Sequence, residues 1–253
     1  MGQKRLLVAG NWKMNGLRAD AELMVEGLAS RCHAMGNVAV DIALFPPATL
    51  LDYMVRALDD TPVAIGGQDC HRAEKGAFTG DLSAWMLRDV GASHVLLGHS
   101  ERRTGHAESS AQIKDKAQAA QAAGLVAIIC VGENSSERDR GETLAVVGRQ
   151  VQESLPAGAT YANTIIAYEP VWAIGSGQVP TMEEIANVHG EIRRLLAKVI
   201  GDDAGATRIL YGGSVKPSNA AEILGLGDVD GALVGGASLI LDDFWAIVTA
   251  AVR

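Results

Sequence analysis

The sequence predicts an α/β protein folded as a single (β/α)8 barrel, in which eight parallel strands are surrounded by helices. Two observations carry this prediction. The chain has 253 residues, close to the roughly 250 typical of such barrels. Eight short apolar or β-branched runs recur along it, and segments with helical periodicity lie between them. Because no segment resembles a linker, we expect one domain over residues 1–253.

The eight predicted strands are nearly continuous in apolar character, which is typical of strands buried on both faces of a parallel sheet. In chain order they cover residues 5–11, 38–45, 63–68, 92–99, 125–131, 164–169, 208–211 and 231–234.

The predicted helices have apolar residues at helical spacing. They include residues 19–31, 110–123, 143–154, 181–200, 219–224 and 239–251. Alternation of strand and helix indicates right-handed βαβ units. An open sheet would show a Gly-x-Gly-x-x-Gly turn after its first strand, but residues 10–16 read GNWKMNG. A closed barrel is therefore favoured.

Composition and charge exclude several classes of protein. Hydrophobic residues make up 48% of the chain, enough for a sizeable core. The 22 basic and 30 acidic residues give a net charge of −8, which opposes binding to nucleic acid or anionic membranes. The first apolar run stops at Asn11, too early for a signal peptide, and no run approaches the length of a membrane span. We expect a soluble, cytoplasmic protein.

The cysteines are Cys32, Cys70 and Cys130, too few and too scattered for a disulfide framework or a zinc site. We interpret them as packed or idle thiols in a reducing compartment, and we expect no bound metal. Cys130 ends a predicted strand among apolar neighbours, which favours packing over reactivity.

Polar residues gather where the predicted strands end. In barrels of this kind the active site lies at the C-terminal ends of the strands. The polar groups at these ends comprise one carboxylate, one imidazole, one cation and two glycine-rich turns, which suit proton transfer on a phosphorylated substrate. They are Asn11, Lys13, His99, Glu169, Gly212, Gly213, Ser214, Gly235 and Gly236.

Six motifs in order along the chain resemble those of the triosephosphate isomerase family. They are residues 11–15 (NWKMN), 76–80 (GAFTG), 98–103 (GHSERR), 167–175 (AYEPVWAIG), 211–214 (YGGS) and 231–237 (GALVGGA). The resemblance covers nearly the whole chain. It implies an aldose–ketose isomerase of glycolysis and gluconeogenesis that interconverts dihydroxyacetone phosphate and D-glyceraldehyde 3-phosphate, without a metal or an organic cofactor.

The resemblance also implies roles for individual residues. Glu169 is expected to act as the general base, and His99 as a neutral electrophile that handles the substrate oxygens. Lys13 is expected to stabilise the phosphate and the developing enediolate. Asn11 would hold Lys13 and donate to a substrate oxygen, and Glu101 would contact the same lysine.

Backbone N–H groups are expected to bind the phosphate. The glycine-rich turns would supply them from Gly213, Ser214, Gly235 and Gly236. Residues 170–177 are expected to form a lid that adds donors near Gly175 and Ser176.

In this lid Trp172 and Ile174 would seal the top of the site. The chain departs from the family at Ser176 and Gln178, where Thr and Lys are frequent, so the hinge of the lid is expected to differ.

The resemblance implies a homodimer. The loop of residues 76–80 would reach the neighbouring subunit, with Thr79 close to the partner's Asn11 and the partner's His99. Asp69 stands where relatives often have Asn, which changes a loop contact rather than the chemistry.

Two other interpretations remain open from the residues themselves. One is a different phosphate-binding barrel, such as an aldolase or a ribose-phosphate isomerase. A Schiff-base aldolase would need a lysine within a strand, and the predicted strands contain none. The other is a non-catalytic barrel that serves as a scaffold. That interpretation predicts a lost base or electrophile, whereas Glu169, His99 and Lys13 are all present.

Overall fold

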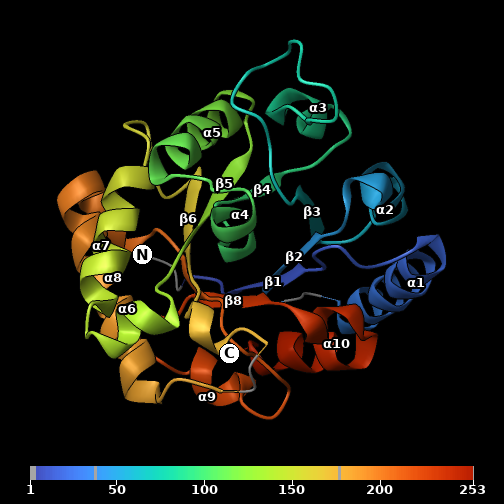
Figure 1. Cartoon of the computed structure of the whole chain (residues 1–253). Helices are drawn as coiled ribbons and strands as arrows, with labels where there is room; N and C mark the ends of the chain where they lie inside the picture. The colour runs from blue at the N-terminus through green and yellow to red at the C-terminus, as the bar shows by residue number, and fades with distance from the viewer. Residues whose placement is uncertain (1–3, 37–38, 176–177, 253) are drawn as a thin grey trace.

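A closed barrel of eight parallel strands forms the centre of the computed structural model, which describes residues 4–36, 39–175 and 178–252 (Figure 1). Each strand pairs with the next along the chain, and β1 pairs with β8 to close the barrel. The predicted fold class is confirmed. The strands are β1 (Leu7–Asn11), β2 (Asp41–Phe45), β3 (Val63–Gly67), β4 (His94–Leu97), β5 (Val126–Val131), β6 (Thr164–Tyr168), β7 (Ile209–Tyr211) and β8 (Gly231–Val234).

Helices connect the strands and surround the barrel (Figure 1). The α-helices are α1 (Arg18–Met35), α2 (Leu51–Ala57), α3 (Ala84–Asp89), α4 (Ser100–Gly105), α5 (Ser110–Ala122), α6 (Ser135–Asp139), α7 (Thr143–Ser154), α8 (Met182–Ile200), α9 (Ala220–Leu224) and α10 (Leu241–Ala250). Short 3-10 turns are η1 (Ala48–Leu50), η2 (Val171–Ala173), η3 (Gly201–Gly205) and η4 (Gly236–Leu239). Sequence periodicity did not predict α2, α3 or α6, which at five to seven residues leave little room for a helical repeat, although it did predict the equally short α9.

Several strands end earlier than predicted, and this frees functional residues from the sheet. Strand β4 ends at Leu97, after which Gly98 turns the chain with a φ of +67°. His99 therefore lies beyond the strand. Strand β6 ends at Tyr168, so Glu169 is the first residue after it. A residue outside the strand can turn its side chain towards the centre of the barrel rim.

The core has two layers, one inside the barrel and one between the barrel and the helices. Along β1, Leu7 and Ala9 pack inside the barrel with Phe45 of β2, whereas Val8 packs in the outer layer. Both faces of the strand are buried. This explains why the strands are apolar throughout instead of alternating.

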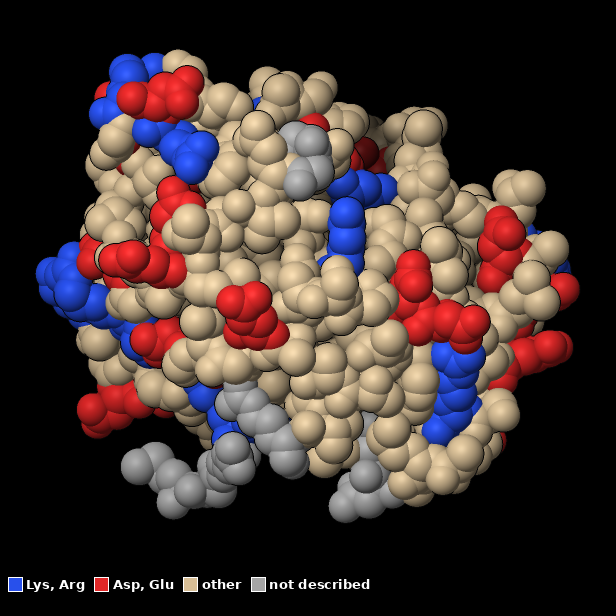
Figure 2. Space-filling model, turned by 90° about the horizontal axis from the view of Figure 1, so that it is seen from below, with Lys and Arg blue, Asp and Glu red and all other residues tan. Residues whose placement is uncertain are grey.

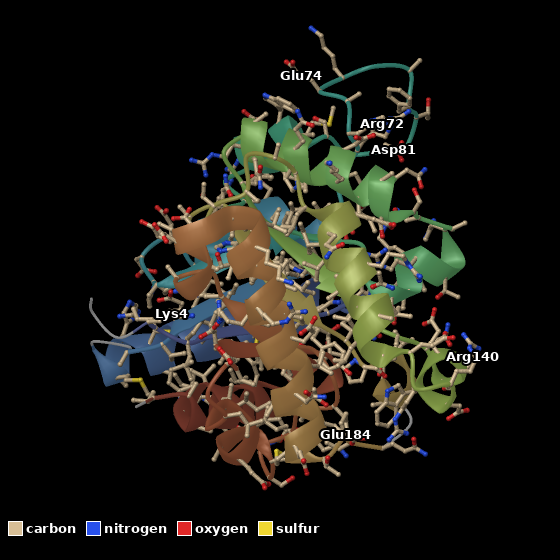
Figure 3. The ribbon with its side chains drawn as sticks, turned by 90° about the vertical axis from the view of Figure 1, so that its left-hand side faces the viewer. Lys4, Arg72, Glu74, Asp81, Arg140 and Glu184 are labelled. Carbon is tan, nitrogen blue, oxygen red and sulfur yellow. The ribbon has the colours of Figure 1, made fainter. Side chains whose placement is uncertain are left out.

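The segment between β3 and α3 projects from the barrel as a long loop (Figures 1 and 3). Arg72, Glu74 and Asp81 lie on this projection in Figure 3, and residues 74–82 are exposed. A hydrogen bond from the backbone N–H of His71 to the carbonyl of Leu82, 2.7 Å long, closes its base. Within the described residues no helix is long and apolar enough to cross a membrane.

Candidate active site

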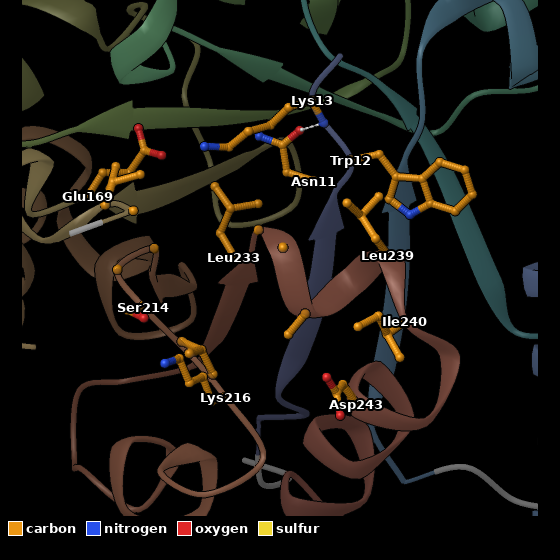
Figure 4. Close-up of a pocket in the computed structure, with 18 of the residues that line it drawn as sticks. Asn11, Trp12, Lys13, Glu169, Ser214, Lys216, Leu233, Leu239, Ile240 and Asp243 are labelled. Carbon is orange, nitrogen blue, oxygen red and sulfur yellow. Dashed lines mark hydrogen bonds between the residues drawn. The ribbon is translucent and has the colours of Figure 1, made fainter. Parts of the chain in front are cut away.

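A pocket of about 590 Å³ opens at the C-terminal ends of the strands. Asn11 lines it from the last position of β1, and Lys13 and Glu169 line it just after β1 and β6 (Figure 4). His99 lines it after β4. The fold thus brings together four residues that the sequence analysis had proposed as catalytic. Because parallel strands all point the same way, residues that follow different strands meet at one end of the barrel.

His99 and Glu169 are paired in this pocket. The Nε2 atom of His99 lies 2.8 Å from Oε1 of Glu169. The other carboxylate oxygen of Glu169 accepts a 3.0 Å hydrogen bond from the backbone N–H of Ser100. Glu169 is only 2% exposed and His99 5%, so water screens this pair poorly.

The hydrogen-bond partners of His99 indicate which of its ring nitrogens carries the proton. It caps the N-terminus of α4, where its Nδ1 atom accepts from the backbone N–H of Glu101 at 3.3 Å. An accepting Nδ1 carries no proton, so Nε2 carries the proton and donates to Glu169. Burial lowers the pKa of His99, but the charge and the hydrogen bond of Glu169 outweigh it, so the pKa is raised from its ordinary value. If the carboxylate moves away, burial and the charge of Lys13 both favour the neutral imidazole.

Lys13 adopts a left-handed backbone conformation, with a φ of +56°. Such a conformation is uncommon for lysine and is found mostly where neighbouring contacts impose it. Its backbone N–H donates to Oδ1 of Asn11 at 3.0 Å (Figure 4), and its carbonyl accepts from Nε2 of Gln68 at 2.8 Å. Its ammonium lies 2.7 Å from a carboxylate oxygen of Glu101. Sequence reasoning missed Gln68, which touches Lys13 only through the backbone.

The glycine-rich turns form the opposite wall of the pocket. Gly213, Ser214, Gly235 and Gly236 all line it. The N–H groups of Gly213, Ser214 and Gly235 donate to no acceptor in the part of the chain that the structure describes. They can therefore donate to an anion such as a phosphate.

Two glycines are required here by close approach. A Cβ on Gly213 would lie 2.1 Å from the hydroxyl of Tyr211. A Cβ on Gly212 would lie 2.9 Å from Cγ of Glu169, so this glycine leaves room for the side chain of the proposed base.

The expected lid lies only partly in the pocket wall. Ile174 and Gly175 line the pocket, while Ser176 and residue 177 lie outside the described residues. Trp172, which was expected to seal the top, does not line the pocket in this structure. Its indole N–H instead donates to Oε1 of Glu133 at 2.8 Å, as a partly buried indole N–H needs an acceptor.

Glu133 is a buried residue that the sequence analysis did not identify. It is 1% exposed, and its Oε1 atom also accepts from the hydroxyl of Tyr168 at 3.2 Å. Its carbonyl accepts from the N–H of Val171 at 3.0 Å. Burial raises the pKa of its carboxyl group, which the Trp172 hydrogen bond partly offsets. Glu133 therefore holds the first residues of the lid to the barrel.

Two accessory residues proposed from the sequence lie outside this pocket. Glu101 contacts Lys13 but lines a neighbouring cavity of about 190 Å³, together with Asn11, Met14 and His99. Thr79 is exposed on the projecting loop and is not brought to the site of its own chain.

The sequence analysis also did not predict the residues that form the outer wall of the pocket. It includes Lys216, which follows the first glycine-rich turn by two residues, and Ile240 and Asp243 near the start of α10. Lys216 stands close to that turn in the sequence, and this closeness could have identified it as a residue of the pocket. In the three described stretches no group of three or more His, Cys, Asp or Glu residues is arranged to hold a metal ion.

Known proteins resemble this chain along nearly its whole length. The sequence model of the family described as triosephosphate isomerase matches residues 6–251. A triosephosphate isomerase of Xanthobacter flavus is 53% identical over 251 residues, which cover 98% of each chain. One from Ruegeria sp. (strain TM1040) is 55% identical over 97% of this chain and 98% of its own.

A solved structure agrees with the sequence comparison. The crystal structure of triosephosphate isomerase from Bartonella henselae superimposes with a TM-score of 0.91 at 45% identity. The match covers 98% of this chain and all of that one, so the likeness extends to the whole barrel.

Proposed function

The chain belongs to the triosephosphate isomerase family, and from that premise we propose that it interconverts dihydroxyacetone phosphate and D-glyceraldehyde 3-phosphate in the pocket described above. The observation that carries this assignment is the contact between His99 and Glu169, in one pocket with Lys13 and two glycine-rich turns. This combination supplies a base, an electrophile, a cation and phosphate donors. The reaction is a step of glycolysis and gluconeogenesis.

Glu169 is the proposed general base. Its carboxylate takes a proton from C1 of dihydroxyacetone phosphate, and the electron pair of that bond forms the double bond of the enediolate. The same group then returns a proton to C2. Since both carboxylate oxygens are engaged by His99 and the N–H of Ser100, Glu169 must exchange these partners for the substrate.

His99 and Lys13 are the proposed stabilisers of the oxygen charge. The Nε2–H group that donates to Glu169 can donate instead to the substrate carbonyl, and it then manages the protons of the two oxygens. Lys13 adds positive charge beside the enediolate, and Asn11 fixes its backbone. Both act on charge that develops in the transition state, which is where stabilisation accelerates the reaction.

The phosphate is proposed to accept hydrogen bonds from the turns after β7 and β8. The N–H groups of Gly213, Ser214 and Gly235, which donate to no described acceptor, support this, together with the position of Gly236 and Gly175 in the same wall. We propose that the lid, including Ser176, adds donors and excludes water, so that the enediolate does not lose its phosphate.

We also propose a homodimer in which the projecting loop enters a neighbouring subunit. The exposed loop, with Phe78 46% exposed beside Thr79, supports this. The 190 Å³ cavity beside the active site is suited to receive Thr79, since it includes Asn11, His99 and the 95% exposed Met14. Thr79 would then brace the site of the partner.

Further proposals concern the domain organisation, the cellular location and the partners of the enzyme. We propose one catalytic domain over residues 1–253, which is supported by the pairing of the first strand with the last. Free, buried cysteines support a cytoplasmic location. On the described surface seen in Figure 2, acidic and basic side chains are interspersed with much uncharged area and form no continuous basic band, which supports the proposal of no nucleic-acid partner.

The test is isomerisation in deuterated water. The purified chain should convert D-glyceraldehyde 3-phosphate to dihydroxyacetone phosphate and place deuterium at C1, since an enediolate exchanges its proton with solvent. Both are measured by proton NMR without any coupling enzyme. Formation of the product without any deuterium at C1, in single-turnover conditions with excess enzyme, would argue against proton abstraction by an exchanging base.

A further inference from the structure

The pocket carries one cation whose role the proposed reaction does not explain. Its charged lining residues within the described chain are Lys13, Glu169, Lys216 and Asp243. The ammonium of Lys13 is paired with Glu101 at 2.7 Å. The ammonium of Lys216 is exposed and has no ion pair or hydrogen bond to any described residue. Lys216 is therefore the unpaired cation of the pocket.

Lys216 lies on the same loop as the proposed phosphate donors. In Figure 4 it lies beside Ser214, and Asp243 lies across the pocket from them. The side chain of Asn219 fixes this loop, because its Oδ1 accepts from the N–H of Lys216 at 2.8 Å and its Nδ2 donates to the carbonyl of Ser214 at 3.0 Å. The positive charge is thus attached to a restrained backbone close to Ser214.

The charge balance of the pocket depends on this residue. Lys13, Glu169, Lys216 and Asp243 together carry no net charge, and Glu101, which is paired with Lys13, adds a negative charge beside them. Without Lys216 the four-residue set would carry a net charge of −1, in a chain whose net charge is already −8. A triose phosphate is close to a dianion at neutral pH. It would approach such a pocket against electrostatic repulsion.

We propose that Lys216 is an anion-capturing residue, which speeds the association of the phosphorylated substrate and takes no part in the proton transfer. The proposal rests on the proposed function for the identity of the substrate. An exposed charge near the mouth of a pocket acts on the approaching ligand through water, so its effect is long-ranged and sensitive to salt. It should appear in kcat/KM rather than in kcat.

The test compares Lys216→Gln with Lys198→Gln, a control that removes the same charge from an exposed position on α8. At an ionic strength of about 10 mM, Lys216→Gln should lower kcat/KM by about three- to tenfold, because the Debye length there is about 30 Å. At about 0.3 M the difference should shrink to less than about twofold. The kcat value should stay within about twofold, Lys216→Arg should restore kcat/KM, and the control should match the parent.

Two results would overturn the proposal. One is an unchanged kcat/KM of Lys216→Gln at low ionic strength. The other is a loss that is the same at both ionic strengths and includes kcat, since that pattern indicates a direct contact in the chemical step.

Binding of inorganic phosphate separates this proposal from the proposed function, because it requires no turnover. At low ionic strength Lys216→Gln should bind phosphate several-fold more weakly than Lys198→Gln, as measured by calorimetry. If it does while the parent chain fails to isomerise triose phosphates, the proposed function is wrong and the anion-capturing role stands. Equal phosphate affinity in the two variants would refute that role.

Discussion

The Nε2 atom of His99 and the Oε1 atom of Glu169 are 2.8 Å apart, so the proposed electrophile and the proposed base are hydrogen-bonded to each other. The backbone N–H of Ser100 holds the second oxygen of the carboxylate. A substrate that reacts with both groups must therefore separate them. Its carbonyl oxygen takes the place of the carboxylate at His99, and its adjacent carbon meets the released carboxylate.

Replacing the base should abolish turnover without unfolding the chain. Glu169→Gln keeps the size of the side chain and an oxygen that can accept from the N–H of Ser100, but an amide cannot take a proton from carbon. The isomerisation rate should fall by at least roughly 10²–10⁴-fold, as is typical when a general base is lost. Circular dichroism should be unchanged. The control Glu222→Gln makes the same change at an exposed position on α9 and should keep full activity. Near-normal turnover by Glu169→Gln would refute the assignment.

Removing the cation should impair both binding and chemistry. Lys13→Met should raise KM and lower kcat, because the charge serves the bound phosphate and the enediolate alike. Stability should change little, since Glu101 is 56% exposed and an exposed ion pair contributes at most about 1 kcal/mol. Steady-state kinetics and thermal unfolding measure the two effects separately. A loss of stability with normal kinetics would make Lys13 a structural residue.

The projecting loop should control the assembly. Replacing residues 76–80 with a short polar turn should yield monomers, because the exposed Phe78 and Thr79 are proposed to fill a neighbour's cavity. Analytical ultracentrifugation should show the parent at twice the mass of one chain. The monomers should have poor activity, since Thr79 would no longer brace the partner's site. Fully active monomers would remove the bracing role, and a monomeric parent would remove the dimer itself.

The lid should protect the intermediate as well as accelerate the reaction. Ile174 lines the pocket and is only partly buried, so Ile174→Ser should weaken the apolar cover and leave the fold intact. Isomerisation should slow, and a larger share of the substrate should decompose to methylglyoxal and phosphate. Val179→Ser, at a 40% exposed position outside the pocket wall, is the matched control. The readout is the ratio of released phosphate to isomerised sugar. A slower enzyme with an unchanged ratio would limit the lid to substrate binding.

Buried histidines should make the fold sensitive to acid. Burial lowers the pKa of His189 from 6.5 to about 4. Between pH 6.5 and 4 the unfolded chain therefore binds a proton at this residue that the folded chain does not. The free energy of unfolding should thus fall as the pH falls through this window, by about 3 kcal/mol for this one group.

The variant His189→Asn tests this through the pH slope and not through absolute stability, which also changes when a buried side chain is altered. Denaturant unfolding between pH 7 and 4 should show a shallower slope than in the parent chain. Equal slopes in the parent and His189→Asn would mean that His189 becomes protonated within the fold.

Much of this architecture follows from the sequence because it depends on local patterns. Runs such as residues 125–131 are apolar on both faces, and that property alone predicts a strand covered on both sides. Asn11, His99 and Glu169 each stand at or just beyond the end of such a run. Closing eight parallel strands into a barrel then brings these residues to one rim, whatever the details of the loops.

Other features were decided only by the tertiary structure. The hydrogen bond of Trp172 to Glu133 and the left-handed backbone of Lys13 leave no periodic trace in the sequence. Each depends on how segments far apart in the chain pack and on which rotamer reaches a partner. Local patterns report which face of an element is buried. They do not report which polar group from another loop will satisfy a buried donor, because that choice is made only when the loops meet in space.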